Sequence, residues 1–422
     1  MTVDDSQTVL HSGSHVVVIG AGHAGVQFAA AARELGFDGQ VTLLNGDGCE
    51  PYERPILSKD FLKSADRLPT FLRSDAYYTD TDIGLLRAEV AGVDTTRREV
   101  HTEDGRTWTY DHLVFATGGR PRVLEVPNRN LPGIVTLRTL EDAEELRARL
   151  ASSRRVVVVG GGFIGLEVAA AAVAQQKTVV VVEAMDRLMA RVMSEEPSRA
   201  ALDHHRSSGA EVLLGRQVTA FEGVDHVTGV CLDNGRLIPA DLVVVGVGME
   251  ANDEIARSAG LATDRGIVVD CDLRASDPHV SAIGDCSVVT IKDTGSARRL
   301  ESIANANSQA RRVAEQLVGH PSSGEPVPWF WSHQGSLKLQ IVGFPDPSND
   351  HVIAGDATKF SVLCFGDGLL RAVESVNDAG GHMAARRVLE GRHSVTRQTC
   401  QDKGFDLRRI AQHCLRASAA TA

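Results

Sequence analysis

Residues 15–25 read HVVVIGAGHAG, and residues 155–165 read RVVVVGGGFIG. In each stretch a continuous apolar run ends in a glycine motif of the form G-x-G-x-x-G, and an alanine-rich, helix-like stretch follows. A second apolar run, at 41–44 and at 178–183, completes each strand–helix–strand unit. Continuous apolar runs are typical of parallel strands buried on both faces. The chain is therefore predicted to be an α/β protein with two Rossmann-type dinucleotide-binding units.

The glycines of these motifs have defined physical roles. The first makes a tight turn, the second lets the backbone approach a pyrophosphate, and the third lets the helix pack closely on the strand. Free N–H groups and the dipole of the following helix attract the phosphates. One such motif is weak support for a cofactor, because glycine turns also arise for packing reasons. Two motifs with matching strands predict two sites, and the glycines assigned to them are Gly20, Gly22, Gly25, Gly160, Gly162 and Gly165.

The ends of the second strands predict which nucleotides bind. Glu183 ends the strand of the second unit, 18 residues after Gly165. A carboxylate there accepts hydrogen bonds from the ribose hydroxyls of NAD and would repel a 2′-phosphate. The second unit is predicted to prefer NADH to NADPH, and the alternative is an ordinary surface glutamate. In the first unit Asp47 is displaced from the expected position, so a ribose contact competes with an ordinary turn aspartate.

Composition excludes several classes of function. A chain of 422 residues with 43% hydrophobic and 23% charged residues is globular, with two or three domains expected. The net charge of −11 makes nucleic-acid binding a poor prospect. No apolar run approaches the ~20 residues of a membrane span, and residues 1–15 lack the apolar core of a signal peptide.

The cysteines point away from metal and dithiol chemistry. None of the seven forms a C-x-x-C pair, so neither a zinc ribbon nor a dithiol of that spacing is predicted, and no metal site is expected. Their scattered positions fit the reducing cytoplasm. Beyond the proline-containing stretch 321–328, PSSGEPVP, the pattern changes to short strands and a helix, which predicts a third, α+β unit.

Longer motifs are far more specific than the glycine turns. They are PYERPILSK at 51–59, ATGGRP at 116–121, LRTL at 137–140, SDP at 276–278 with IGDC at 283–286, and VPWFWS at 327–332. Together they resemble the FAD-dependent, NADH-dependent ferredoxin reductases of bacterial oxygenase systems, the family of putidaredoxin reductase and biphenyl dioxygenase reductase. The resemblance covers about residues 15–390 in order.

This resemblance implies a glutathione-reductase-like fold. It implies an FAD-binding domain at 1–118 and 253–325, an NAD-binding domain at 119–252 and a C-terminal α+β domain at 326–422. Two positions depart from the family pattern. Gly46 and His333 stand where relatives usually carry an acid, which puts the adenosine contact of FAD and the surface near the partner in question.

The resemblance also assigns residues to the cofactors. Ala24 is expected on the FAD pyrophosphate, Lys59 near the flavin ring, Val90 at the adenine and the backbone of Ile303 at the flavin. Further FAD contacts are expected from Arg54, Ala116, Thr117, Gly118, Arg138, Gly284 and Asp285. In the second unit residues 160–167, including Ile164, should surround NAD, with Glu183 on the ribose and Arg191 near the adenosine end.

The implied chemistry is physically coherent. A nicotinamide delivers two electrons as a hydride, an iron–sulfur protein accepts one at a time, and a flavin can do both. The expected function is hydride transfer from NADH to FAD, then single electrons to a [2Fe–2S] ferredoxin that feeds a cytochrome P450 or Rieske-type oxygenase. Lys59 and Glu167 are the expected catalytic residues, a cation for reduced flavin and its carboxylate partner. Otherwise Glu167 is only a helix-start acid that complements the dipole.

Other functions of the same fold remain open. A disulfide reductase needs a cysteine pair that the sequence lacks near the first unit. A single-cysteine NADH oxidase or peroxidase would use Cys49, whose acidic neighbours disfavour a thiolate. A redox-controlled interaction protein is the third alternative. For the ferredoxin itself, which is expected to be acidic, the candidate docking residues are Arg311, Arg312, Lys338, Arg386 and Arg387.

Overall fold

The computed structural model describes residues 9–64, 66–290, 297–346 and 350–421, which form two compact units. The first eight residues, part of the stretch tested for a signal peptide, lie outside this description. The first unit comprises the chain up to Glu53, Pro69–Arg120 and Met249–Pro326, and the second comprises Arg54–Leu68, Pro121–Gly248 and the chain from Val327.

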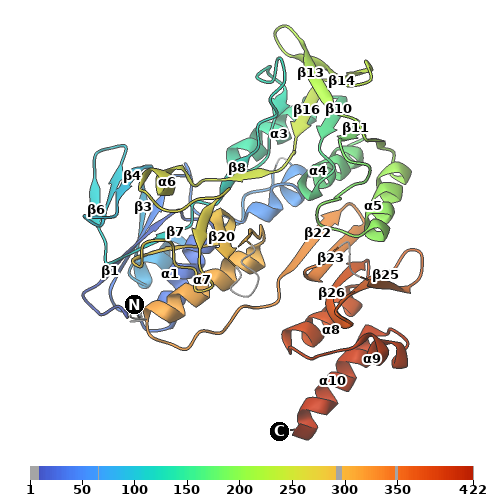
Figure 1. Ribbon diagram of the computed structural model, residues 1–422. Helices are drawn as coiled ribbons and strands as arrows, with labels where there is room; N and C mark the ends of the chain where they lie inside the picture. Colours follow the sequence, from blue (N-terminus) through green and yellow to red (C-terminus); the bar gives the residue numbers. More distant parts are fainter. Residues whose placement is uncertain (1–8, 65, 291–296, 347–349, 422) are drawn as a thin grey trace. The chain divides into compact units, whose positions relative to one another are not determined.

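A five-stranded parallel sheet forms the centre of the first unit (Figure 1). Its order is β19 (Val280–Ala282), β7 (His112–Phe115), β1 (His15–Ile19), β2 (Gln40–Asn45) and β3 (Ile83–Arg87). The strand β1, which ends at the first glycine turn, thus lies in the middle of the sheet. The long helices of this unit are α1 (His23–Glu34) and α7 (Ile303–Leu317), which pack against each other, and the short ones are α2 (Asp75–Asp80) and α6 (Glu254–Ser258).

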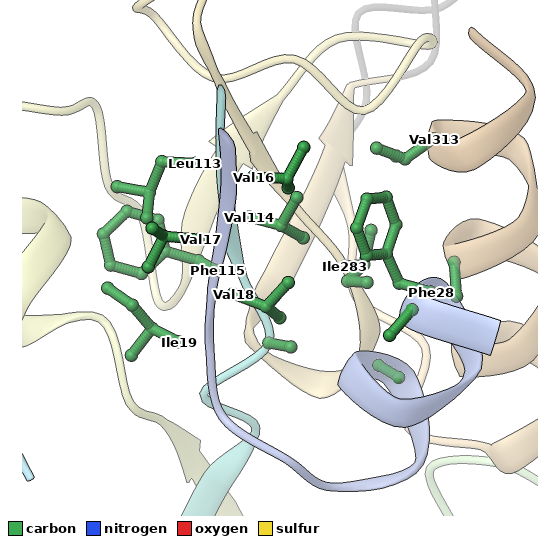
Figure 2. Packing of buried hydrophobic residues seen from close by; sticks show 14 of the residues in the cluster. Val16, Val17, Val18, Ile19, Phe28, Leu113, Val114, Phe115, Ile283 and Val313 are labelled. Carbon is green, nitrogen blue, oxygen red and sulfur yellow. The ribbon is translucent and has the colours of Figure 1, made fainter. Parts of the chain in front are cut away.

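The strand β1 is buried on both of its faces, as its continuous apolar run predicts. Figure 2 shows Val16 and Val18 on the side of Phe28, whereas Val17 and Ile19 point the other way. This alternation is the period of two expected for a strand. The core residues that join them from other elements are Leu113, Val114, Phe115, Ile283 and Val313.

Smaller sheets complete the first unit. One is antiparallel, with β4 (Val90–Asp94), β5 (Glu99–Thr102) and β6 (Thr107–Thr109). Another contains β18 (Ile267–Val269), β20 (Ser287–Thr290) and β21 (Ala297–Arg298), and β17 (Met249–Ala251) pairs with β8 (Gly119–Pro121). A 3-10 turn, η3 (Gly284–Cys286), follows β19.

The second unit repeats the parallel arrangement. Its sheet has the order β12 (Glu211–Leu214), β11 (Thr178–Glu183), β10 (Arg155–Val159), β16 (Leu242–Val245) and β9 (Ile134–Val135). The helices are α3 (Leu140–Ser152), α4 (Phe163–Ala174) and α5 (Glu195–Ser207), with 3-10 turns η1 (Arg54–Ile56) and η2 (Asp60–Leu62). A small antiparallel sheet adds β13 (Val218–Gly223), β14 (Val227–Leu232) and β15 (Leu237–Pro239).

The C-terminal part of the second unit is α+β, as predicted. Its antiparallel sheet has the order β22 (Trp329–Gln334), β23 (Leu337–Gly343), β26 (Leu369–Val376), β25 (Phe360–Gly366) and β24 (Asp350–Gly355). The helices α8 (Ala379–Glu390), α9 (Arg397–Asp402) and α10 (Leu407–Thr421) follow. Within the described ranges, no helix combines the length and apolar character that a membrane crossing requires.

Candidate active site

The first glycine of each motif is required by the backbone. Gly20 and Gly160 have φ angles of 105° and 108°, a region that side chains other than glycine rarely adopt. A Cβ atom added at Gly20 would lie 2.4 Å from the carbonyl oxygen of Ala116, and one at Gly160 would lie 2.3 Å from that of Gly246. Each motif therefore turns tightly against the neighbouring strand end.

The third and middle glycines of each motif have different surroundings, as their predicted roles require. A Cβ at Gly25 or Gly165 would lie 2.0 or 2.4 Å from the carbonyl oxygen of the motif's first glycine, so these positions allow helix and strand to touch. A Cβ at Gly22 or Gly162 would meet no atom within 4 Å. Both are N-cap residues without a side-chain cap, so the backbone N–H groups of α1 and α4 are left for an anion. Two pyrophosphates fit these two turns.

The turn Gly284-Asp285 lies against the first glycine motif. A Cβ at Gly284 would be 3.0 Å from the Cβ of Ala24. The buried Gln309 of α7 holds this turn, because its Oε1 accepts from the N–H of Gly284 at 2.7 Å and from the hydroxyl of Ser287 at 3.1 Å. The sequence analysis missed Gln309, although a polar residue on the buried face of a helix is a recognisable signal.

The segment Ala116-Thr117-Gly118 is fixed by a second residue that the sequence analysis missed. The N–H of Ala116 donates to the carbonyl of Ile19 at 2.8 Å, at the end of β1. Asn252 closes a reciprocal pair with Thr117: the Thr117 hydroxyl donates to the Asn252 carbonyl at 2.6 Å, and Asn252 Nδ2 donates back at 3.0 Å. The predicted cofactor segment is therefore rigid where it passes Gly20.

Two other predicted FAD contacts lie at the edges of the first unit. Val90 begins β4 and packs against the core. Ile303 begins α7, whose N-cap hydroxyl, that of Ser302, accepts from the N–H of Asn305 at 3.1 Å. Their contacts with FAD stay predictions.

Asp47 belongs to a loop organised by Asn45. The Asn45 amide donates to the carbonyl of Cys49 at 2.9 Å and accepts from the N–H of Asp47 at 3.1 Å. Gly46 is exposed, and a Cβ there would meet nothing within 4 Å. The ribose contact of Asp47 also stays a prediction.

In the second unit Glu183 is fixed beside the glycine turn. Its Oε2 accepts from the N–H of Gly161 at 2.6 Å, and its Oε1 accepts from the N–H of Met185 at 2.7 Å. A carboxylate held in this way keeps lone pairs for ribose hydroxyls. Ile164 is exposed at the start of α4, and Arg191 reaches Gly248, where a Cβ would lie 3.8 Å from the guanidinium.

The second unit also brings together Arg54 and Arg138. Arg54 Nη1 donates to the carbonyl of Arg138 at 3.0 Å. Arg138 precedes α3, whose capping box joins Thr139 and Asp142, and the Asp142 carboxylate also accepts from the N–H of Arg138 at 2.8 Å. Two residues assigned to FAD thus share one local scaffold.

Lys59 and Glu167 form an ion pair in the second unit. Lys59 Nζ lies 2.8 Å from Glu167 Oε2, and the two side chains are 19% and 4% exposed. Lys59 Nζ also donates to the carbonyl of Pro55 at 3.1 Å. Glu167 is buried and held by a cation, so its position serves more than the dipole of α4. The pairing is present as expected, and the roles of the two residues at the flavin stay predictions.

One docking prediction is wrong. Arg312 is only 7% exposed, and its guanidinium donates to the carbonyl of Cys271 within the first unit. A side chain buried in this way cannot itself contact a docked protein. Arg311, one position along α7, is exposed and forms ion pairs with Glu34 at 3.4 Å and Glu315 at 3.2 Å.

The remaining docking candidates lie in the C-terminal sheet and α8. Lys338 and Arg387 are exposed. Arg386 stacks over the Trp329 ring at 4.2 Å and pairs with Glu390 at 2.8 Å. Exposed His333 faces Lys338 across β22 and β23, and burial together with Lys59 lowers its pKa. A neutral His333 adds no charge to this edge.

The fold and these turns define a flavin- and nicotinamide-dependent oxidoreductase with two dinucleotide sites. The family model of the pyridine nucleotide-disulphide oxidoreductases matches residues 14–310, and the model described as reductase C-terminal matches residues 329–411. The chain belongs to the pyridine nucleotide-disulphide oxidoreductase family. None of the seven cysteines, all of which lie in the described residues, is nevertheless part of a disulfide bond.

Individual relatives agree with the family. The chain is 43% identical over 404 residues to rhodocoxin reductase of Rhodococcus erythropolis, covering 94% of this chain and 95% of the relative. The ferredoxin reductase for the CYP199A2 system from Rhodopseudomonas palustris superposes with a TM-score of 0.91 at 43% identity, covering 94% of this chain and 100% of that one. The reductase in the covalent putidaredoxin reductase–putidaredoxin complex gives 0.90 at 35% identity, covering 96% and 99%.

These comparisons confirm the predicted family and the glutathione-reductase-like α/β fold with its C-terminal α+β part. They also confirm an enzyme of the ferredoxin reductase type that uses FAD and a nicotinamide dinucleotide.

Proposed function

We propose that this protein is an NADH-dependent reductase of a [2Fe–2S] ferredoxin, which in turn supplies a cytochrome P450 or Rieske-type oxygenase. The observation that carries the proposal is the presence of two glycine turns in one chain, each open at its middle glycine, together with the ion pair between Lys59 and the buried Glu167. Rhodocoxin reductase and putidaredoxin reductase are similar to this chain over nearly its whole length.

The residues divide the work between binding and positioning. FAD, when bound, accepts a hydride and releases single electrons. The turn at Gly20–Gly25 would hold its pyrophosphate, supported by Ala116–Gly118 and the Gly284-Asp285 turn. The turn at Gly160–Gly165 would hold the nicotinamide dinucleotide, with the ribose at Glu183. The Lys59 ammonium would stabilise negative charge on the reduced cofactor.

The domain division and the compartment are part of the same proposal. We assign FAD to residues 1–118 and 253–325, NAD to 119–252 and a partner-facing role to 326–422. Seven cysteines without a disulfide bond among the described residues suit a reducing cytoplasm, where thiols stay reduced.

The test is electron transfer between purified components. The FAD-loaded protein is mixed anaerobically with NADH and a [2Fe–2S] ferredoxin, and the iron–sulfur absorbance is followed. We expect bleaching within seconds, many times faster with NADH than with NADPH. Fast flavin reduction without any ferredoxin reduction would contradict the proposal. Slow flavin reduction with a long-lived charge-transfer band would favour the redox-controlled interaction protein instead.

For docking, we propose that Lys338 and Arg387, with Arg311 as a further candidate, attract an acidic ferredoxin. Electrostatic attraction acts mainly on the association rate and is weakened by salt. Lys338→Glu and Arg387→Glu should each raise the KM for ferredoxin at low salt and leave ferricyanide reduction unchanged. Arg409→Glu, an exposed change of equal charge on α10, is the control. If all three variants raise the KM for ferredoxin equally, the effect comes from the net charge of the protein, and the docking role of Lys338 and Arg387 is wrong.

A further inference from the structure

The carboxylate of Glu167 receives hydrogen bonds from three side chains, which come from two separate parts of the chain. Its Oε2 accepts from Lys59 Nζ at 2.8 Å and from the Ser58 hydroxyl at 2.5 Å. Its Oε1 accepts from the Ser332 hydroxyl at 2.6 Å. Ser332 belongs to β22, so the C-terminal part of the second unit reaches the predicted catalytic pair directly.

The hydrogen bonds continue beyond Ser332. Gln334 Nε2 lies 3.3 Å from the Ser332 hydroxyl, and Gln334 Oε1 lies 2.9 Å from Nε2 of His205 on α5. Ser332 and Gln334 are 0% exposed and His205 is 1% exposed. Three fully buried polar side chains are costly unless each is satisfied, and here each satisfies the next.

The chemistry of the groups fixes the direction of this chain. A carboxylate only accepts, so the Ser332 hydroxyl must donate to Glu167. The Ser332 oxygen then accepts from the amide nitrogen of Gln334, which turns the Gln334 carbonyl toward His205. His205 must therefore carry its proton on Nε2. Burial lowers the pKa of His205, which leaves the ring neutral at neutral pH.

We propose that Ser332, Gln334 and His205 are positioning residues that hold the Glu167 carboxylate, and through it the Lys59 ammonium, in one orientation. The consequence for the flavin rests on the proposed function above. All donors in the chain point toward Glu167, so the bonds polarise one another in the same sense. Two of the three Lys59 N–H donors have partners in Glu167 and the Pro55 carbonyl, so a third donor remains for the cofactor of the proposed function.

The first experiment removes the link nearest the carboxylate. In Ser332→Ala, flavin reduction at saturating NADH, measured per bound FAD, should slow about tenfold, as expected for a lost hydrogen bond to a charged group. The Kd for NADH should stay unchanged, and the flavin midpoint potential should become more negative. Ser332→Cys replaces the hydroxyl with a thiol of similar size that is a weaker donor. Its rate of flavin reduction should lie between the rates of the wild type and of Ser332→Ala. Ser361→Ala is the matched control, because Ser361 is a buried serine of the same sheet that bonds to Ser375 instead.

The second experiment tests whether the chain acts in series. Gln334→Leu should slow the reduction less than Ser332→Ala, and the double variant should be no slower than Ser332→Ala alone. If the two substitutions instead acted through independent changes in packing, the double variant would show the sum of the two losses in free energy of activation. Nitrogen-15 NMR of the folded protein should show the Nε2–H tautomer of His205, and Gln334→Leu should shift that resonance.

The outcomes separate this inference from the proposed function. If Ser332→Ala matches Ser361→Ala in rate and potential while Lys59→Met lowers both, the positioning role is overturned and the reductase proposal stands. If Lys59→Met also changes neither, the role of the ion pair at the flavin is wrong. Additive losses in the double variant, or a Nδ1–H tautomer of His205, would each overturn the chain as drawn.

Discussion

The two glycine turns have the same backbone conformation. The two units differ in the residue at the end of the second strand, which lies beside the turn. Ile19 pairs with Leu44 in the first unit, and Val159 pairs with Val182 in the second. The next position along each second strand is therefore equivalent, and it holds Asn45 in one case and Glu183 in the other. The side chain of Asn45 bonds to Asp47 and Cys49 of the loop that begins there, whereas the Glu183 side chain bonds back to Gly161 of the turn.

This difference shows how a duplicated unit acquires two cofactors. The glycines create a generic site for a pyrophosphate, because their roles depend only on the turn and on the helix start. The side chain at the strand end then selects the nucleotide. A carboxylate recognises ribose hydroxyls, while the neutral amide leaves recognition to other residues of the loop.

The largest expected effect comes from a methyl group at the first glycine of either turn. Gly20→Ala and Gly160→Ala each force a non-glycine residue to a positive φ against a carbonyl oxygen, a strain that costs at least about 1–3 kcal/mol. Gly20→Ala should lose FAD, measured by flavin absorbance per protein. Gly160→Ala should keep FAD and lose NADH binding.

Variants of the middle glycines serve as controls for that experiment. Gly22→Ala and Gly162→Ala place a methyl group in open space, so urea unfolding should change little while the Kd of the corresponding dinucleotide rises. If either middle-glycine variant unfolds as readily as the first-glycine variants, the division between turn and binding roles is wrong.

Glu183 should set the nicotinamide preference. Glu183→Ala should reduce the preference for NADH over NADPH by about 1–3 kcal/mol, the usual value for a hydrogen bond to a charged group. Asn45→Asp, which gives the first turn a carboxylate at the equivalent position, should not change it. The ratio of kcat/KM for the two nucleotides measures both effects. An unaltered ratio in Glu183→Ala would remove the ribose assignment.

A buried histidine, His112, should make the first unit sensitive to acid. Val16 pairs with His112 in the first unit, and Val156 pairs with Leu242 in the second. His112 and Leu242 therefore occupy equivalent positions. Burial lowers the pKa of His112 to about 3. As the pH falls below 6.5, His112 therefore takes up a proton in the unfolded chain before it does so in the folded one. The free energy of unfolding that is present above pH 6.5 decreases as the pH falls toward 3.

His112→Leu copies the second unit at that position. Between pH 7 and pH 5 the variant should lose about 2 kcal/mol less of its unfolding free energy than the wild type, measured by urea unfolding at both values. The free energy of unfolding of the variant at pH 7 also differs from that of the wild type, because the 3.0 Å hydrogen bond between His112 and Ser281 is lost. Parallel losses in both proteins would show that other groups govern acid unfolding.

The smallest effect is expected at Cys49, in the loop that Asn45 organises. Cys49→Ser should retain NADH oxidation linked to ferredoxin, because no cysteine is predicted to react. A loss of more than about tenfold with FAD still bound would restore the single-cysteine peroxidase alternative, since a reactive thiolate is the feature such an enzyme requires.

Local signals in the sequence predicted the parts of the site that are local in structure. The glycine turns are contiguous, and their strand–helix–strand setting is as expected, with α1 and α4 beginning at His23 and Phe163. A long family motif was sufficient to locate Lys59.

Residues that act across long sequence distances were missed. The sequence analysis named Glu167 but not its partners Ser58 and Ser332, which lie 109 and 165 residues away from it, and no spacing pattern connects them to it. Gln309 and Asn252 likewise act on turns remote in sequence. Arg312 was misassigned because two adjacent arginines on a helix point in different directions, so one is exposed and the other lies against a buried carbonyl.

The convergence of two distant chain segments, residues 58–59 and β22, on Glu167 limits how such reductases can be recombined. A chimera that takes its C-terminal part from a relative also takes the hydroxyl at 332 and the amide at 334 from that relative. An exchange made at residues 321–328 would take Ser332 and Gln334 from one parent and Glu167 and His205 from the other. Crossovers that keep Ser332 and Gln334 with the native His205 should preserve activity better than crossovers chosen from domain borders alone.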